Sequence, residues 1–311
     1  SASTSTTASG GTTSATSGAT GSGGGSTAAA TSTGGESSGG LLDHCPTVAT
    51  PIKVATIQDP EIDEASGLVA SRSQPGVFWT HNDSGDGPRI FAIDGSGATL
   101  GTFTLKGAKA DDWEDMAIGP GPSPGEWLYL GDIGDNSEVR RSITVYRVRE
   151  PDAASAGGGA VAVDGAQAIA LTYPDGAHNA ETLMVDPQTG DLVIVAKGDP
   201  TRVFTLAAPI AAGGPFELAE LAPINAPATF ATGGDISPLG DFIAVRTYFE
   251  AHLWLRPPGA SVGEALAGEP CTIPLAIELQ GETLAIDPEG AGYYTLSEMA
   301  AQPLWRMAFE G

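Results

Sequence analysis

A three-part pattern repeats five times between residue 64 and the C-terminus, and it constrains the fold more than any other feature of the sequence. Each repeat opens with an acidic residue followed by small and apolar residues and a turn. A strongly β-prone run comes next, and then an alternating run that carries an aromatic residue. The opening acids are Glu64, Glu114, Glu181, Asp235 and Glu282, which lie 47 to 67 residues apart. Because the segments are short, rich in β-formers and broken by Gly and Pro, they argue against a helical solenoid.

A period near 50 residues built from short strands predicts an all-β fold, a five-bladed β-propeller. Fourth strands are predicted at residues 98–105, 167–173, 216–221 and 272–279. The fifth repeat reaches the C-terminus without a fourth strand, whereas the strand at 52–57 precedes the first repeat and has no blade. We therefore expect strand 52–57 to pair with the last repeat and close the ring, which removes an exposed edge. A six-bladed ring is the alternative, and the 67-residue interval after Glu114 is the only place for another blade.

The first 40 residues have a different composition from the rest of the chain. They contain 21 Ser or Thr and 11 Gly, and no side chain larger than that of Glu36. Nothing there offsets the entropy of ordering the backbone, so residues 1–40 are predicted to be a disordered tether and residues 41–311 the propeller domain. We interpret the tether as the spacer of an exported protein, secreted or held at the bacterial surface, with a leader and a lipid-bearing Cys expected ahead of Ser1. A linker between two domains is the alternative.

The chain is strongly acidic. It has 38 Asp and Glu against 14 Lys and Arg, a net charge of −24. Nucleic acid and anionic membrane surfaces are therefore excluded as partners by repulsion. No apolar run approaches the roughly 18 to 20 residues of a membrane span.

The two cysteines are predicted to form one disulfide. Cys45 precedes the closing strand, and Cys271 opens the predicted outer strand of the fourth blade. In an exported chain, two Cys without the close spacing of a zinc site are most simply paired, here across the seam of the ring. Two free thiols are the alternative.

Acidic and amide side chains gather where the central channel of a propeller would open. The inner strand of each blade starts at this mouth, and the loop after the second strand returns to it, so the five opening acids should form a ring. The returning loops add Asn82, Asp83, Asp86, Asp132, Asp135, Asn136, Lys197, Ser297 and Glu298. Converging carboxylates cannot all stay ionised unless a cation neutralises them, and a hard divalent ion, Ca²⁺, suits oxygen ligands. The alternative is that each acid caps backbone N–H groups of a neighbouring blade.

Two further features refine the prediction of this mouth. Four acids surround Trp113 in the stretch 111–115, which is more than capping requires. Basic residues near the same face, among them Lys197 and Arg246, suit a phosphate or carboxylate ligand or, alternatively, pair with the adjacent acids. Nucleophilic catalysis has little support, because the sequence has no Gly-x-Ser-x-Gly elbow and no Cys/His pair.

Several motifs together resemble a group of uncharacterised exported β-propeller proteins of soil bacteria. They are the segments 64–68, 81–86, 112–117, 131–136, 146–148 and 179–183. More distantly, the mouth acids are similar in placement to those of calcium-dependent propeller enzymes: β-propeller phytases, calcium-activated nucleotidases and gluconolactonase-like lactonases. That resemblance implies metal ligands at Glu64, Glu114, Glu181, Glu282, Ser297 and Glu298. The sequence departs from it in lacking a Lys-rich phosphate pocket and in carrying Asp235 where Glu is expected.

The sequence therefore predicts an exported propeller that binds Ca²⁺ at its channel mouth and uses that face to recognise an envelope or extracellular ligand. A Ca²⁺-dependent hydrolase of phosphoesters or lactones is the first alternative. A structural component of the envelope is the second.

Overall fold

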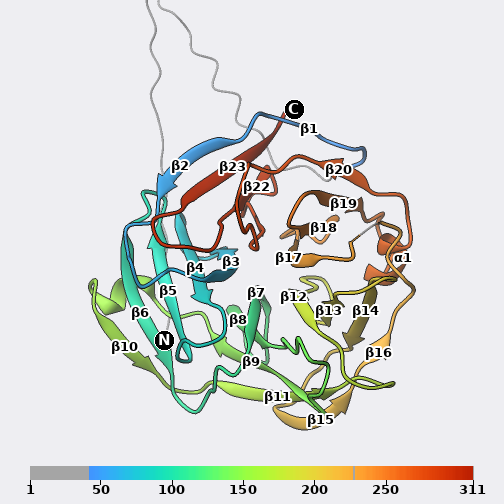
Figure 1. The fold of residues 1–311 in the computed structure, drawn as a ribbon, viewed down its shortest axis with the longest axis horizontal. Coiled ribbons are helices and arrows are strands. Elements are labelled where there is room, and N and C mark those ends of the chain that lie inside the picture. The colour runs from blue at the N-terminus through green and yellow to red at the C-terminus, as the bar shows by residue number, and fades with distance from the viewer. Residues whose placement is uncertain (1–41, 227, 311) are drawn as a thin grey trace, which may run out of the picture. The chain divides into compact units, whose positions relative to one another are not determined.

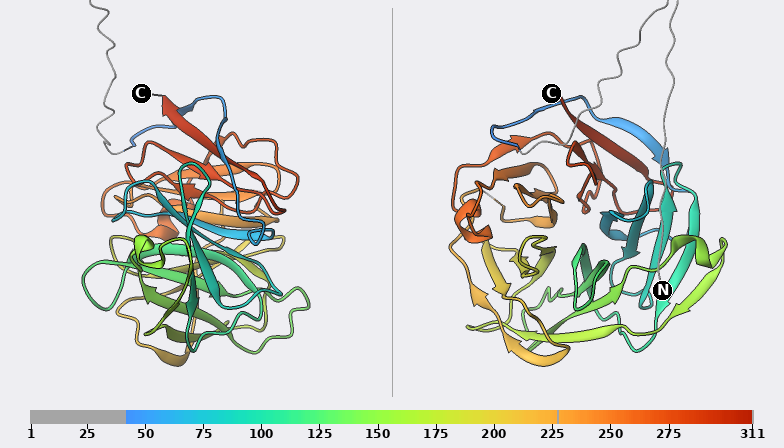
Figure 2. Two further views of the ribbon diagram at one scale, coloured as in Figure 1. Left: turned by 90° about the vertical axis from the view of Figure 1, so that its left-hand side faces the viewer. Right: turned by 180° about the vertical axis from the view of Figure 1, so that it is seen from behind.

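A computed structural model describes residues 42–226 and 228–310, and within these the chain forms five β-sheet blades arranged in a ring (Figures 1 and 2). The predicted tether lies outside the described residues. The five-bladed propeller is confirmed. Helix is confined to a short 3₁₀ turn at Ala153–Ala156 and to α1 (Val262–Leu266) in the part of the chain described. None of the described helices is long and apolar enough to cross a membrane.

Each blade is an antiparallel sheet whose first strand lies nearest the centre of the ring (Figure 1). Blade 1 contains β3 (Ala65–Ala70), β4 (Val77–Asn82), β5 (Arg89–Asp94) and β6 (Thr99–Leu105). Blade 2 contains β7 (Trp113–Pro120), β8 (Glu126–Asp132), β9 (Ile143–Arg149) and β11 (Gln167–Thr172). Blade 3 contains β12 (Ala180–Val185), β13 (Leu192–Ala196), β14 (Arg202–Leu206) and β16 (Ala219–Glu220). Blade 4 contains β17 (Ala231–Ile236), β18 (Phe242–Thr247), β19 (Ala251–Leu255) and β20 (Cys271–Ile273). Blade 5 contains β21 (Ala285–Ile286), β22 (Gly292–Thr295) and β23 (Pro303–Glu310).

The core lies between successive blades. Inner strands such as β3 and β12 are buried along their whole length, because neighbouring blades cover both of their faces. Large side chains fill these interfaces: Trp79 of β4 contacts Phe103 edge-to-face at 5.1 Å between ring centroids, and both are fully buried. Burial of this aromatic surface is the main contribution to stability, because a single sheet cannot shield its own faces from water.

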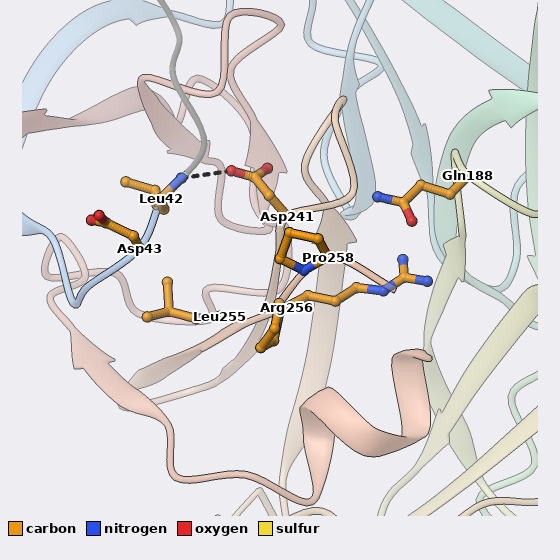
Figure 3. Close-up of a pocket in the computed structure, with 8 residues that line it drawn as sticks. Leu42, Asp43, Gln188, Asp241, Leu255, Arg256 and Pro258 are labelled. Atoms are coloured by element: carbon orange, nitrogen blue, oxygen red, sulfur yellow. Dashed lines mark hydrogen bonds between the residues drawn. The ribbon is translucent and has the colours of Figure 1, made fainter. Parts of the chain in front are cut away.

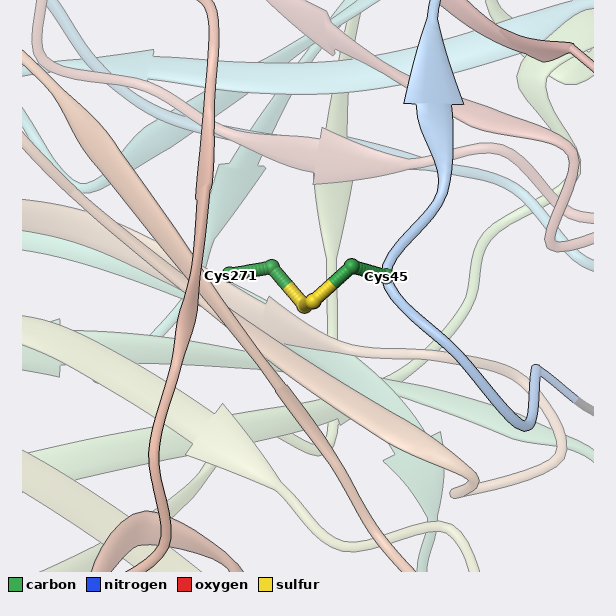
Figure 4. Close-up of a disulfide and its surroundings, with 2 residues drawn as sticks. All are labelled: Cys45 and Cys271. Atoms are coloured by element: carbon green, nitrogen blue, oxygen red, sulfur yellow. A yellow bond between two sulfur atoms is a disulfide. The ribbon is translucent and has the colours of Figure 1, made fainter.

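The N-terminal strand closes the ring, as predicted. Strands β1 (Thr47–Val48) and β2 (Ile52–Thr56) both pair antiparallel with β23 and complete blade 5. The Cys45–Cys271 disulfide is also present, with a Cα–Cα distance of 5.6 Å that is typical of such bonds (Figure 4). It joins Cys45, two residues ahead of β1, to the first residue of β20 in blade 4. Because it closes a loop spanning 226 residues, the loop-entropy model gives a stabilisation of about 5 kcal/mol.

Two predicted outer strands are wrong in detail. Residues 216–221 were expected to be one strand of blade 3. Instead β15 (Gly213–Glu217) pairs in parallel with β11 of blade 2, and only β16 joins blade 3. The strand predicted at 272–279 ends at Ile273, because Pro274 has no N–H to donate to the ladder.

The 67-residue interval contains no sixth blade in the described chain. After β9 the chain turns back to blade 1, where β10 (Ala160–Val163) pairs in parallel with β6, and then returns as β11 of blade 2. Strand β10 thus joins the outer edge of the blade before its own, as β15 does. The extra length is used to link neighbouring blades.

Candidate metal centre at the channel mouth

Each inner strand has a β-bulge near its start, at the channel mouth. We define the mouth face as the end of the ring where β3, β7, β12, β17 and β21 begin. In each blade the pairing with the second strand shifts by one residue there, which leaves one residue unpaired. The unpaired residues are Ser66, Glu114, Glu181, Thr232 and Glu282.

This register corrects the predicted ring of five acids. Only Glu114, Glu181 and Glu282 occupy the bulge. Glu64 lies two residues ahead of the bulge in blade 1, and its side chain is exposed. Asp235 lies three residues beyond the bulge in blade 4 and is buried. A shift of one residue along a strand turns a side chain to the opposite face, so recurrence of an acid in sequence did not determine its direction.

Two buried aspartates cap backbone N–H groups of neighbouring blades. This is the alternative role that the sequence suggested for all five acids. Asp115 accepts N–H bonds from Leu183 of blade 3 (2.9 Å) and Gly234 of blade 4 (3.4 Å). Asp235 accepts one from Ile286 of blade 5 (2.9 Å) and lies 3.8 Å from Arg72. Burial, opposed by Arg72, raises the pKa of Asp235 to about 6. These carboxylates join blades to one another.

A second set of mouth residues follows the second strand of each blade. In each blade, one residue at the mouth directly follows the last residue of the second strand that pairs with the first strand. In blades 1 to 5 these residues are Asp83, Ile133, Lys197, Tyr248 and Glu298. Tyr248 was missed from the sequence, although aligning it with Lys197 would have found it. Asp112 was noticed there only as part of an acidic stretch.

Asp83, Asp112 and Glu114 bring their carboxylates together. One oxygen from each lies within 4.8 Å of the others. Gly134 permits this approach, since a Cβ there would lie 2.1 Å from Glu114 Oε1 and 2.5 Å from Asp112 Oδ2. Within the described residues, no basic side chain forms an ion pair with any of the three. Arg140 of an adjoining loop pairs with Asp132 instead, and Arg89 at the start of β5 pairs with Asp86.

Glu114 is the most enclosed of these three acids. It is 4% exposed, and its carboxylate accepts no hydrogen bond from the residues described. Burial, followed by the charges of Glu181, Asp83, Asp112 and Glu282, raises the pKa of Glu114 to about 11. Burial and then the Asp83 charge raise the pKa of Asp112, against the opposing effect of Arg140. Two of the three clustered carboxyls thus resist ionisation unless positive charge is supplied.

The other bulge acids have partners. Lys197 forms an ion pair with Glu181 and donates to the Tyr248 hydroxyl at 3.3 Å. The Tyr248 hydroxyl in turn donates to Glu282 at 3.3 Å. Burial and the neighbouring Glu298 raise the pKa of Glu282 to about 8. The mouth therefore contains an uncompensated acidic cluster over blades 1 and 2 and a paired network over blades 3 to 5.

The remaining predicted site residues bond to the protein framework. Their contacts are the Asn82 amide with the Glu61 carbonyl (2.7 Å), Asp132 with Arg140 (2.7 Å), Asp135 with the Arg140 N–H (2.6 Å), Asn136 with the Asn179 amide (3.2 Å), Arg246 with Glu278 (2.9 Å) and the Ser297 hydroxyl with the Gln280 carbonyl (2.7 Å). Asp86 is likewise bonded to Arg89 at 2.9 Å. The contacts of Asn82, Asp86, Asp132 and Asp135 fix the loops that carry Asp83, Asp112 and Gly134.

A cavity of about 420 Å³ lies at the opposite end of blade 4 (Figure 3). Leu42, Leu255 and Pro258 give it an apolar wall. Its two central polar groups are already bonded: Asp241 accepts the Leu42 N–H at 2.8 Å, and Arg256 pairs with Asp186 at 2.8 Å. It therefore offers apolar surface without reactive groups.

No protein-family model and no curated protein matches the sequence. Solved structures to which the chain is similar include the PQQ-bound form of an aldose sugar dehydrogenase from Streptomyces coelicolor, with 12% identity, a TM-score of 0.48, and coverage of 85% of this chain and 98% of that one. U3-55K has 13% identity, a TM-score of 0.42, and coverage of 85% and 100%. A nidogen/laminin complex has 13% identity, a TM-score of 0.43, and coverage of 76% and 73%. At these identities and scores, the similarities do not bear on activity.

Proposed function

We propose that the channel mouth binds Ca²⁺ through Asp83, Asp112 and Glu114, and that the protein is an exported module which recognises a ligand at this face. The observation that carries the proposal is the buried Glu114 carboxylate, which has no partner in the described chain and faces two further carboxylates. A divalent cation would supply the positive charge that these groups lack.

The donor set favours Ca²⁺ over other divalent ions. All three groups are carboxylates, which hard cations prefer, and they come from two segments, the loop after β4 and the start of β7, which leave room for the further ligands of a six- to eight-coordinate Ca²⁺. Zn²⁺ would favour histidine, but His81 is fully buried, bonds to the Asn82 carbonyl at 2.8 Å and packs edge-to-face on Trp113 at 5.4 Å between ring centroids. The disulfide is consistent with export, since such bonds persist in oxidising compartments.

Calorimetric titration and thermal unfolding with and without Ca²⁺ test the proposal. Ca²⁺ at 100 times its Kd should stabilise the protein by about 2.7 kcal/mol. Glu114→Gln should abolish most of this gain, whereas Glu282→Gln, a matched change at an equivalent bulge, should retain it. If titration detects no binding and a chelator leaves the Tm unchanged, the proposal is wrong.

One observation favours a hydrolase as the second candidate. Glu282, with its pKa raised to about 8, is suited to transfer protons near neutral pH beside a cation-bound substrate. Panels of phosphoesters and lactones, assayed with Ca²⁺ and with chelator, would detect this activity. Loss of turnover in Glu282→Gln with Ca²⁺ binding intact would assign the proton-transfer role.

A further inference from the structure

Exposed apolar side chains gather on the mouth face. Six of the eight large apolar side chains that are exposed in the described chain belong to its loops: Val139, Phe230, Phe249, Ile277, Leu279 and Met299. All except Val139 lie on blades 4 and 5, and we call these five the apolar rim. Ile277 is 98% exposed, Leu279 83% and Phe249 82%. Exposed apolar residues that cluster on one face mark a binding surface more often than scattered ones do.

The protein holds the rim in place beside the mouth. Phe249 follows Tyr248, and their rings lie 6.3 Å apart between centroids, while the Tyr248 hydroxyl bonds to Glu282. Glu278 lies between the two most exposed rim residues and is itself fixed by the buried Arg246 (2.9 Å) and the Thr295 hydroxyl (2.9 Å). The bonds of Glu278 thus turn Ile277 and Leu279 outward.

The rim and the acidic cluster belong to the same opening. Met299 of the rim donates its backbone N–H to the Asp63 carbonyl at 2.6 Å, and Asp83 donates its own backbone N–H to the carbonyl of the next residue, Glu64, at 2.8 Å. Gln280, the neighbour of Leu279, bonds to Glu298 at 2.5 Å. One ligand bound across this opening can therefore contact the cluster and the rim at once.

We propose that the ligand of this face is a small amphipathic anion. Its carboxylate or phosphate group completes the coordination of a cation held by Asp83, Asp112 and Glu114, and its apolar part lies on the rim. This inference rests on the proposed cation site, because three carboxylates leave coordination positions open for an anionic ligand. A free amphiphile fits better than an anionic bilayer, since the net charge of −24 opposes approach to an extended anionic surface.

Titration with a homologous series of carboxylates tests the inference. The full chain, loaded with Ca²⁺, is titrated calorimetrically with butanoate, hexanoate and octanoate. Affinity should rise about two- to fourfold with each added methylene that reaches the rim. The double variant Phe249→Ser, Ile277→Ser should flatten this dependence and leave Ca²⁺ affinity unchanged. Leu239→Ser, an exposed apolar residue at the opposite end of blade 4, is the matched control and should behave as wild type.

Each outcome separates the inference from the proposed cation site. Ca²⁺ binding without any dependence on chain length overturns the inference alone. Absence of Ca²⁺ binding overturns the cation site and the inference with it. Equal carboxylate affinity in chelator shows that the rim acts without the cation, and Ca²⁺-dependent sedimentation with phosphatidylserine vesicles shows that the partner is a bilayer. Either of these last two results also overturns the amphiphile proposal.

Discussion

An acid lies near each end of strand β12, and folding shifts the pKa values of the two acids in opposite directions. Glu181 lies at the mouth, where burial raises its pKa against the effect of Lys197. Asp186 lies in the turn at the other end, where bonds from Arg256, Gln188 and Thr189 outweigh burial and lower its pKa. Blade 5 repeats this contrast, with the pKa of Glu282 raised and that of Asp287 lowered against burial by Glu289 and Arg306.

The difference lies in the partners. Asp186 receives two guanidinium bonds from Arg256 of the next blade, at 2.8 and 3.0 Å. Among the described residues, Glu181 has only Lys197 and the Asn179 amide as partners. Glu114 faces two other carboxylates and has no basic partner in the part of the chain described. Both ends belong to one sequence pattern, an acid followed five residues later by Asp-Pro. A carboxylate that is fully bonded stabilises the fold, and one that lacks partners is available to a ligand.

Breaking the Asp186–Arg256 pair should have the largest effect. Both side chains are at most 4% exposed, so Arg256→Ala leaves a buried carboxylate uncompensated and should cost about 3–5 kcal/mol in the free energy of unfolding. Urea denaturation measures the change. Lys106→Ala, which removes an exposed pair with Asp164, should cost less than about 1 kcal/mol. Equal losses in the two variants would mean that the opposite face is no better paired than the surface.

The same pair should determine part of the acid sensitivity. Because folding lowers the pKa of Asp186, its contribution is complete above the unfolded value near 3.9 and is lost as the pH falls through the folded value. The acid limb of the stability curve should therefore be shallower in Arg256→Ala than in wild type. A limb of unchanged slope would assign acid denaturation to other groups.

Replacing an acid at the mouth should stabilise the protein, whereas breaking the Asp186–Arg256 pair destabilises it. In chelator, Glu114→Gln should raise the free energy of unfolding by about 1–2 kcal/mol at pH 8, because folding of the wild type must hold the Glu114 carboxyl protonated at a pH where the unfolded chain has lost that proton. Folding raises the pKa of Glu114, so wild-type stability falls as the pH rises above the unfolded value near 4.3. The gain in the variant should accordingly shrink between pH 8 and pH 5. A destabilised Glu114→Gln would show that the carboxylate has a structural partner.

The smallest expected effect belongs to the paired side of the mouth. Tyr248→Phe removes two bonds of 3.3 Å in a half-buried network and should cost about 1 kcal/mol. Thr189→Val, which removes a 2.9 Å bond to Asp186, is the matched change on the opposite face and should cost at least as much. A larger loss in Tyr248→Phe would mean that the mouth network is the better stabilised of the two.

Local pattern predicted the ring, its closing strand and the disulfide, because each follows from strand spacing or from the position of two cysteines. The outer strands β10 and β15 were not predicted, since they pair with the preceding blade and no local signal specifies a partner. The mouth was predicted in part. Glu114 and Asp83 were found from their place in the repeat. That Glu114 occupies a bulge and Asp235 does not could not be predicted, because it depends on the register between strands. Gly134 matters only because a loop of the same blade passes over two carboxylates.

The position of the disulfide determines how the domain bears mechanical load. Cys45 precedes β1 and β2, and its covalent partner is in blade 4, whereas the two strands that follow are held to blade 5 by hydrogen bonds. A pull applied through the residues ahead of Leu42 therefore reaches a covalent bond before it reaches the closing strands. The hydrogen bonds of β1 and β2 are spared from unzipping one at a time, and tension at the N-terminal end is transmitted to a neighbouring blade while the ring stays shut.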